Sequence, residues 1–154
     1  MIESSRMIEL PAIPGTYVVC FTLSGAVKIS IGRLGLFDFP AGDYIYLGSA
    51  RGPGGLRARL GRHLRSVKAS HWHIDYLRPY LETRTIGYLP GNDNLECAWS
   101  QSLANLPAAR LHAPGFGASD CVRGCPAHLV AFPADESPLP AALEAWQLKW
   151  IRFD

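Results

Sequence analysis

The sequence predicts an α+β protein in which a small central antiparallel β-sheet is flanked by helices. Runs rich in β-branched and aromatic residues come first, at residues 16–23, 26–31 and 43–48. Segments with apolar residues at helical spacing follow, at residues 56–67 and 95–106. Because most strands precede the helices instead of alternating with them, the pattern favours α+β over a parallel α/β sheet.

Length and composition indicate one globular domain. The chain has 154 residues, of which 48% are hydrophobic and 18% charged, and this excludes a disordered or fibrous chain. Its 15 glycines and 12 prolines predict many turns and short elements. We expect a lead-in over residues 1–13, a domain over 14–133 that includes a Cys/His loop at 113–128, and a C-terminal helical tail over 134–154.

The first two predicted strands flank the turn dipeptide Ser24-Gly25, which predicts that residues 16–23 and 26–31 pair as a β-hairpin. Residues 32–42 are rich in glycine, so we expect a loop there. Further strands are expected at residues 43–48, 83–89 and 127–132.

The helix expected at residues 56–67 is amphipathic. Its leucines share one face, while Arg59 and His63, four residues apart, lie together beside that apolar stripe. This position places both side chains at the rim of whatever the helix packs against. Other helices are expected at residues 71–81, 95–106 and 141–150.

Positive charge is concentrated in one part of the chain. The net charge is only +2, yet residues 51–84 contain eight basic and two acidic residues. Such a cluster is typical of a site for a polyanion such as nucleic acid, and arginine matches phosphate oxygens well. A solvated helix face is the alternative. The candidate nucleic-acid-binding residues are Arg57, Arg62, Arg65, Lys68, His71 and His73.

No apolar run reaches the roughly 18 residues that span a bilayer, and the first residues lack the apolar core of a secretory signal. We therefore expect a cytoplasmic protein with no membrane association. In that compartment cysteines are reduced thiols or metal ligands rather than disulfides. Cys121-x-x-x-Cys125-x-x-His128, with Cys97 elsewhere, is a candidate zinc site, and buried thiols packed in a loop are the alternative.

Three segments together resemble the GIY-YIG nuclease superfamily. Residues 15–17 are G-T-Y, residues 46–48 are Y-L-G, and the following helix carries Arg59 and His63. Glu96 opens the third helical segment, where the family has a single metal-binding carboxylate. The resemblance covers about residues 14–107.

The resemblance implies that the protein binds nucleic acid, with DNA as the expected form, and hydrolyses a phosphodiester bond with one Mg²⁺ or Mn²⁺ held by Glu96. Arg59 holds a phosphate oxygen in this interpretation, and either Tyr17 or Tyr46 orients or deprotonates the water. Tyr44 shares a strand face with Tyr46 and is a third candidate. The implied catalytic residues are Tyr17, Tyr46, Arg59, His63 and Glu96.

The sequence departs from the family pattern at three positions. Thr16 and Leu47 stand in the places of isoleucines, and both are expected to point into the core, where a threonine hydroxyl is the less comfortable. Ser49 stands where repair relatives often have lysine, and this removes a cation beside the expected site.

Four blocks in order, residues 44–50, 54–63, 71–77 and 115–128, are similar to one little-characterised branch of this superfamily. Some members of the branch are joined to endonuclease III-like repair glycosylases, which implies a repair protein as a further partner. Two other functions stay open. One is a catalytically inactive nucleic-acid-binding accessory module for repair or recombination, and the other is a zinc-stabilised interaction domain.

The block His71-x-His73-x-Asp75 has two interpretations. On a strand the three side chains would share one face and form a substrate or metal site, whereas in a helix the two histidines diverge. The structural interpretation has the histidines capping and packing at a helix start, with Asp75 bonded locally.

Overall fold

The computed structural model describes residues 10–65, 72–118, 124–134 and 141–153, and within them the chain has a mixed α+β fold. Five strands form one antiparallel sheet in the order β6-β4-β1-β5-β7. Their bounds are β1 Gly15–Leu23, β4 Gly42–Ala50, β5 Glu82–Pro90, β6 Leu129–Phe132 and β7 Lys149–Arg152. The predicted class, a small central antiparallel sheet flanked by helices, is confirmed.

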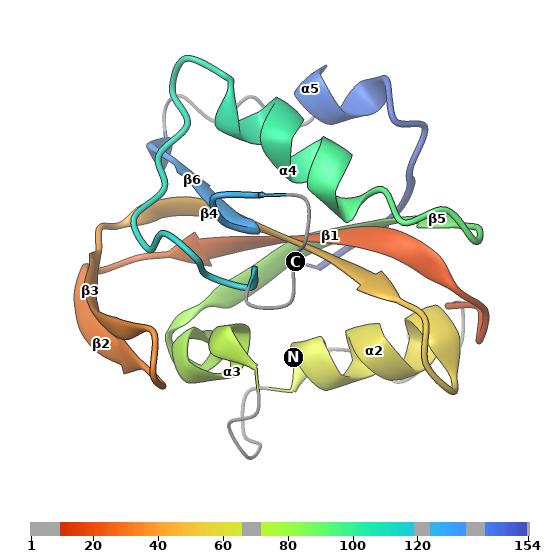
Figure 1. Ribbon diagram of the computed structural model, residues 1–154, viewed down its shortest axis with the longest axis horizontal. Helices are drawn as coiled ribbons and strands as arrows, with labels where there is room; N and C mark the ends of the chain where they lie inside the picture. Colours follow the sequence, from red (N-terminus) through yellow and green to blue (C-terminus); the bar gives the residue numbers. More distant parts are fainter. Residues whose placement is uncertain (1–9, 66–71, 119–123, 135–140, 154) are drawn as a thin grey trace.

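The helices cover both faces of this sheet. Figure 1 shows α4 (Glu96–Ala104) and α5 (Ala141–Glu144) over one face, and α2 (Gly55–Leu64) and α3 (His73–Leu77) over the other. The short 3₁₀ helix η1, Arg78–Tyr80, continues directly from α3. No helix within the described ranges is long and apolar enough to cross a membrane.

β1 is the central strand and separates two hydrophobic cores. Because side chains alternate along a strand, Tyr17 and Val19 join the core beneath α2 and α3, whereas Val18 and Cys20 join the core beneath α4 and α5. Burial on both faces explains why this strand is almost continuously apolar in sequence instead of alternating.

The predicted pairing of the first two strands is wrong. β2 (Val27–Ile31) pairs with β3 (Gly35–Phe39) in a separate two-stranded sheet, and β3 lies inside the segment expected to be a loop. The two edges of β1 are taken by β4 and β5, so they are not open to β2. Gly32, with φ of 48°, supplies the left-handed turn residue between β2 and β3.

The chain end also differs from the prediction. The helix expected at residues 141–150 ends at Glu144, and β7 pairs with β5 as an edge strand of the central sheet. Gly87 of β5 allows this arrangement, because a Cβ there would come within 2.8 Å of the Trp150 ring. The end of the expected helical tail is therefore a strand of the sheet.

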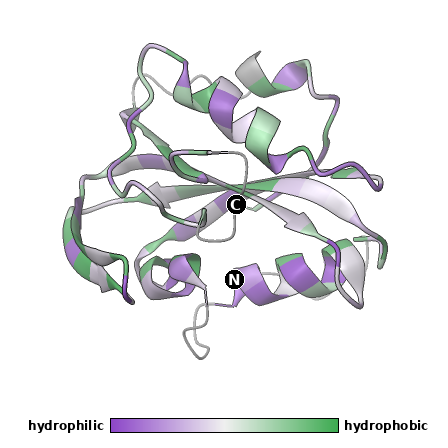
Figure 2. Ribbon diagram, in the orientation of Figure 1, coloured by the Kyte–Doolittle hydropathy of each residue, from purple (hydrophilic) through white to green (hydrophobic). Residues whose placement is uncertain are grey.

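Two glycines position α2. Gly54 and Gly55 have φ of 83° and 56°, and a side chain on Gly55 would collide with the backbone of Ile13. This close approach lets the Leu56 amide donate to the Ile13 carbonyl at 2.9 Å. Figure 2 shows hydrophilic and hydrophobic bands alternating along α2, as expected for an amphipathic helix. Its buried apolar residues are Leu56, Leu60 and Leu64.

Candidate functional site

Tyr17 reaches across β4 to contact α2. In the sheet register Tyr17 pairs with Gly48, and a Cβ at Gly48 would come within 2.6 Å of the Tyr17 Cζ atom. The missing side chain leaves the path open for the phenol, whose oxygen lies 2.6 Å from Nε2 of His63. Tyr17 of the G-T-Y segment and Gly48 of the Y-L-G segment therefore pack directly against each other.

The His63 ring is buried among aromatic rings. Its centroid lies 5.4 Å from that of Tyr17, 5.3 Å from that of Tyr46 and 5.6 Å from that of Trp72. Tyr17 is fully buried, whereas Tyr46 is 8% exposed. Of the two tyrosines, Tyr46 is thus the one nearer to solvent. We call Tyr17, Tyr46, His63 and Arg59 the tyrosine cluster.

The same charged groups act on both phenols. Burial raises the pKa of Tyr17 and of Tyr46 well above the ordinary tyrosine value, and the negative charge of Glu96 raises both further. The positive charge of Arg59 opposes this and lowers the pKa of each phenol. Both tyrosines are therefore protonated at neutral pH, and Arg59 and Glu96 lie close enough to act on each of them.

The Glu96 carboxylate is held between β4 and the segment before β6. Its Oε1 accepts a hydrogen bond from the Ser49 hydroxyl at 3.3 Å, and its Oε2 lies 3.7 Å from Nδ1 of His128. The Glu96 side chain is 20% exposed. The Asn94 side chain accepts the Glu96 amide at 3.2 Å, one residue before Leu95, the N-cap of α4.

Thr16 fixes the start of α4. It is buried, as expected, but its hydroxyl is satisfied because it accepts the Leu95 amide and donates to the Asp93 carbonyl, each at 3.2 Å. The substitution that looked uncomfortable in sequence thus anchors the turn that carries Glu96. Its long-range hydrogen bonds are visible only once β1 and α4 are packed together.

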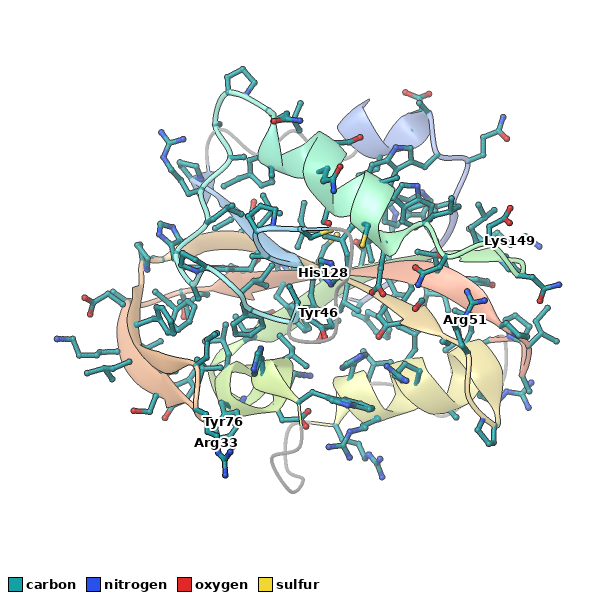
Figure 3. All side chains as sticks on the ribbon, in the orientation of Figure 1. Arg33, Tyr46, Arg51, Tyr76, His128 and Lys149 are labelled. Carbon is teal, nitrogen blue, oxygen red and sulfur yellow. The ribbon has the colours of Figure 1, made fainter. Side chains whose placement is uncertain are left out.

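The five expected catalytic residues do not share one sheet face. α4 packs on the face opposite α2, and within the described residues the polar contacts of Glu96 are with Ser49 of β4 and with His128, not with the tyrosine cluster. β6 pairs with β4 only as far as Tyr46, and beyond it the β4 edge meets the segment of Gly117 and His128. A Cβ on Gly117 would lie 3.2 Å from both Tyr46 and His128. Figure 3 shows Tyr46 and His128 near the centre of the molecule, between the two helix layers.

Trp72 positions Arg59. The guanidinium carbons of Arg59 and Arg62 lie 4.4 and 4.5 Å from the centroid of this ring. Arg62 also forms a 2.7 Å ion pair with buried Asp75, whose carboxylate accepts the Trp72 amide at 2.8 Å. Asp75 is therefore bonded locally, as the structural interpretation of its block expected.

His73 and Asp75 diverge on α3. His73 accepts the Gly117 amide through Nδ1 at 2.8 Å and packs against Phe116, which ties α3 to the loop after α4. Arg57 is exposed on α2 and Arg65 is exposed directly after its end, and Arg57 donates to the Leu10 carbonyl at 2.8 Å. Lys68 and His71, also expected to bind nucleic acid, lie outside the described residues.

The fold brings Cys97 to Cys125 and His128. The two sulfur atoms and a ring nitrogen of His128 all lie within 4.8 Å of one another, and all three residues are buried. The sequence includes Cys97 in the candidate zinc site as a residue distant along the chain, but nothing in the spacing shows that the start of α4 lies over the segment before β6. Cys121 lies outside the described residues.

Arg78 has a structural role that the sequence did not reveal. Its buried guanidinium donates to the carbonyls of His63 at 2.7 Å, Leu81 at 2.8 Å and Leu64 at 3.1 Å. Two of these acceptors end α2, where helix carbonyls lack intrahelical partners. Arg78 is one of the eight basic residues between positions 51 and 84. It does not contribute to a basic surface, because it fixes the end of α2, the helix that carries His63.

One family matches most of the chain. The family described as "Domain of unknown function DUF123" matches residues 16–150. No match was found among curated proteins or among solved structures. Because the matched region covers nearly the whole chain, the protein belongs to the DUF123 family.

Proposed function

We propose that the protein binds nucleic acid and hydrolyses a phosphodiester bond with the help of one divalent ion. One arrangement supports this proposal: Tyr17 of β1 contacts His63 of α2, and Glu96 of α4 accepts a hydrogen bond from Ser49 of β4. In this setting Arg59 lowers and Glu96 raises the pKa of both phenols, those of Tyr17 and Tyr46. A cation, a carboxylate and a phenol can supply the charge stabilisation and the orientation of water that phosphodiester hydrolysis needs.

In this proposal Arg59 binds the phosphate group of the substrate. It is partly exposed at the rim of α2, and its contact with Trp72 limits the orientations of its side chain. A guanidinium can hold two phosphate oxygens at once and neutralise charge that develops in the transition state. We expect a phosphate held by Arg59 to lie beside Tyr46, because Arg59 lowers the pKa of that phenol.

Tyr46 is the tyrosine that orients the water. It is the more exposed of the two, and its raised pKa keeps the hydroxyl protonated, so it acts by hydrogen bonding at neutral pH. Removal of the phenol proton requires a nearby cation that lowers the pKa of Tyr46. Arg59 has this effect, but it is smaller than the effect of burial. Tyr17 is fully buried and bonded to His63, so it positions the cluster without contacting substrate.

Glu96 and Ser49 suit Mg²⁺ or Mn²⁺ because carboxylate and hydroxyl oxygens are hard donors. The partly exposed carboxylate leaves room for the waters that Mg²⁺ keeps. A bound ion supplies charge for the leaving oxygen. Thr16 serves this step indirectly, because it fixes the backbone turn before Glu96.

The exposed arginines Arg51, Arg57 and Arg65 supply the surface for the rest of the polyanion. They flank or belong to α2, the helix that carries Arg59. Arg62 contributes less, because Asp75 holds its guanidinium.

A binding module without catalysis is the second candidate. The observation that favours it is the complete burial of Tyr17 and near-complete burial of His63, which removes two expected catalytic side chains from contact with a phosphate. In that case the basic face of α2 retains its function and the tyrosine cluster serves only stability.

A cleavage assay separates the two. Purified protein is incubated with supercoiled, single-stranded and branched DNA, and with RNA, in Mg²⁺, Mn²⁺ or chelator. We expect metal-dependent cleavage that Glu96→Gln slows by about 10²–10³-fold. The matched control is Glu82→Gln, which alters an exposed glutamate paired with Arg84 and leaves cleavage unchanged. Salt-dependent binding without cleavage in any metal would contradict hydrolysis and support the binding module.

A further inference from the structure

Cys97, Cys125 and His128 form a compact group on the α4 side of the sheet, which we call the thiol cluster. Cys97 is the second residue of α4, while Cys125 and His128 come from the segment that leads into β6. All three are buried, and their ligand atoms lie within 4.8 Å of one another. Figure 3 shows sulfur atoms beside His128 beneath α4.

The spacing suits tetrahedral zinc. Zinc lies about 2.3 Å from thiolate sulfur and about 2.0–2.1 Å from imidazole nitrogen, so a tetrahedral site has sulfur and nitrogen roughly 3.6 Å apart. In the thiol cluster, Sγ of Cys97 and Nε2 of His128 are 3.8 Å apart. This edge of the ligand triangle is therefore close to the one that a zinc ion requires, and the other two edges are no longer than 4.8 Å.

The two nitrogens of His128 face different partners. Nε2 faces the sulfur of Cys97, and Nδ1 faces Oε2 of Glu96 at 3.7 Å. A histidine that binds zinc through one nitrogen usually directs its other N–H to a carboxylate or carbonyl, which fixes the ring and raises its basicity. Glu96 stands where this second partner belongs.

The buried sulfur of Cys125 has polar neighbours, since it lies 4.0 Å from the carbonyl oxygen of Cys97 and accepts from a side-chain amide. Gln101 donates to its sulfur from 3.5 Å, a contact that a thiolate accepts strongly. Cys20 gives the contrast within the same protein. Its sulfur is packed in an apolar core with Val18 and Ile45, and burial raises its pKa to about 12.

We propose that the thiol cluster is a zinc site, with the sulfurs of Cys97 and Cys125 and Nε2 of His128 as three ligands. Two thiolates and an imidazole favour zinc over the hard ions Mg²⁺ and Ca²⁺. On binding, Zn²⁺ displaces the two thiol protons, which pass to solvent, and no electrons are transferred. The ion ties the start of α4 to the segment before β6 and holds His128 against Glu96.

This site stands on its own contacts and does not depend on the proposed hydrolysis. It is tested on the full chain, purified without chelator after growth with added zinc, by elemental analysis and thiol titration. We expect equimolar zinc, and two thiols that become reactive only after chelation. Cys97→Ser and Cys125→Ser lose the zinc, whereas the matched control Cys20→Ser retains it.

Cobalt substitution tests the zinc site without any variant, so its result does not depend on whether a variant folds. Wild-type protein freed of zinc is titrated with Co²⁺, which is expected to give the absorption bands of thiolate-bound tetrahedral cobalt, and added Zn²⁺ abolishes them. Full-length protein without bound zinc and without thiolate–cobalt bands would overturn the site. So would a disulfide between Cys97 and Cys125 in the freshly purified chain.

Discussion

The hydroxyl of Tyr17 lies 2.6 Å from Nε2 of His63, inside a core where both side chains are buried. This contact joins β1 to α2 and holds the histidine between Tyr46 and Trp72. The site therefore depends on a buried polar contact, and such contacts are costly to break because the remaining group is left without water.

Tyr17→Phe is expected to lower the free energy of unfolding by about 1–3 kcal/mol, since it removes one side of that buried hydrogen bond. It also frees the His63 ring and lowers the cleavage rate. Urea unfolding and the cleavage assay measure the two effects. Tyr80→Phe, which alters an exposed tyrosine, is the control and leaves both unchanged. Equal stability of Tyr17→Phe and wild type would show that the contact is not formed in solution.

Gly48→Ala tests the path of the Tyr17 side chain. The new methyl group would occupy the space of the phenol ring, so either the ring or β4 must move. Overpacking of this kind costs roughly 1–3 kcal/mol. Thermal unfolding measures the loss.

The control for this variant is Gly25→Ala, because a Cβ at Gly25 meets no atom within 4 Å. We expect it to unfold like wild type. If Gly48→Ala is equally harmless, Tyr17 does not cross β4 in the way described.

Arg78→Ala is expected to destabilise the protein by about 2–4 kcal/mol, because three carbonyls that Arg78 satisfies lose their buried donors. Arg78→Lys restores only part of this, since an ammonium cannot span the same acceptors. Denaturant unfolding of both variants, with exposed Arg84→Ala as control, measures the difference. A loss no greater than that of Arg84→Ala would exclude the structural role.

Because the Cys20 thiol is buried, the free energy of unfolding is expected to fall at alkaline pH. Burial raises the pKa of its thiol from 9.0 to about 12, so the unfolded chain ionises first. The stability held by the neutral thiol is present below pH 9 and is lost as pH rises toward about 12, at roughly 1.4 kcal/mol per pH unit. Tyrosines contribute in the same direction at higher pH.

The difference between wild type and Cys20→Ala isolates the thiol. Unfolding free energies at pH 8 and pH 10.5 are compared, and the variant is expected to lose less stability over this interval. Parallel losses in the two proteins would show that Cys20 ionises alike in the folded and unfolded states.

Local patterns were enough to predict most of the elements. The β-branched run of β1 and the leucine spacing of α2 each depend on neighbouring residues, so both were visible in sequence. The β2–β3 pairing was missed because it depends on which strands occupy the edges of β1, a tertiary fact. β7 was likewise missed, because its pairing with the edge of β5 depends on the assembled sheet and not on the local sequence.

The site was predicted in part. Arg59 and His63 lie together because they are four residues apart on one helix. The hydrogen bonds of Thr16 to the turn before α4, and the approach of Cys97 to His128, join residues distant in sequence. No local pattern reports such contacts, so packing alone reveals them.

A double-mutant cycle on the cleavage rate tests the central claim, that Arg59 and Glu96 serve one catalytic site although they approach it from opposite faces of the sheet. Rates are measured for wild type, Arg59→Ala, Glu96→Gln and the double variant at saturating Mg²⁺. We expect each single change to lower the rate by about 10²–10³-fold, and the double variant to be little slower than the slower single variant. Losses that multiply, or a wild-type protein that cleaves no nucleic acid in any divalent metal, would contradict a shared site.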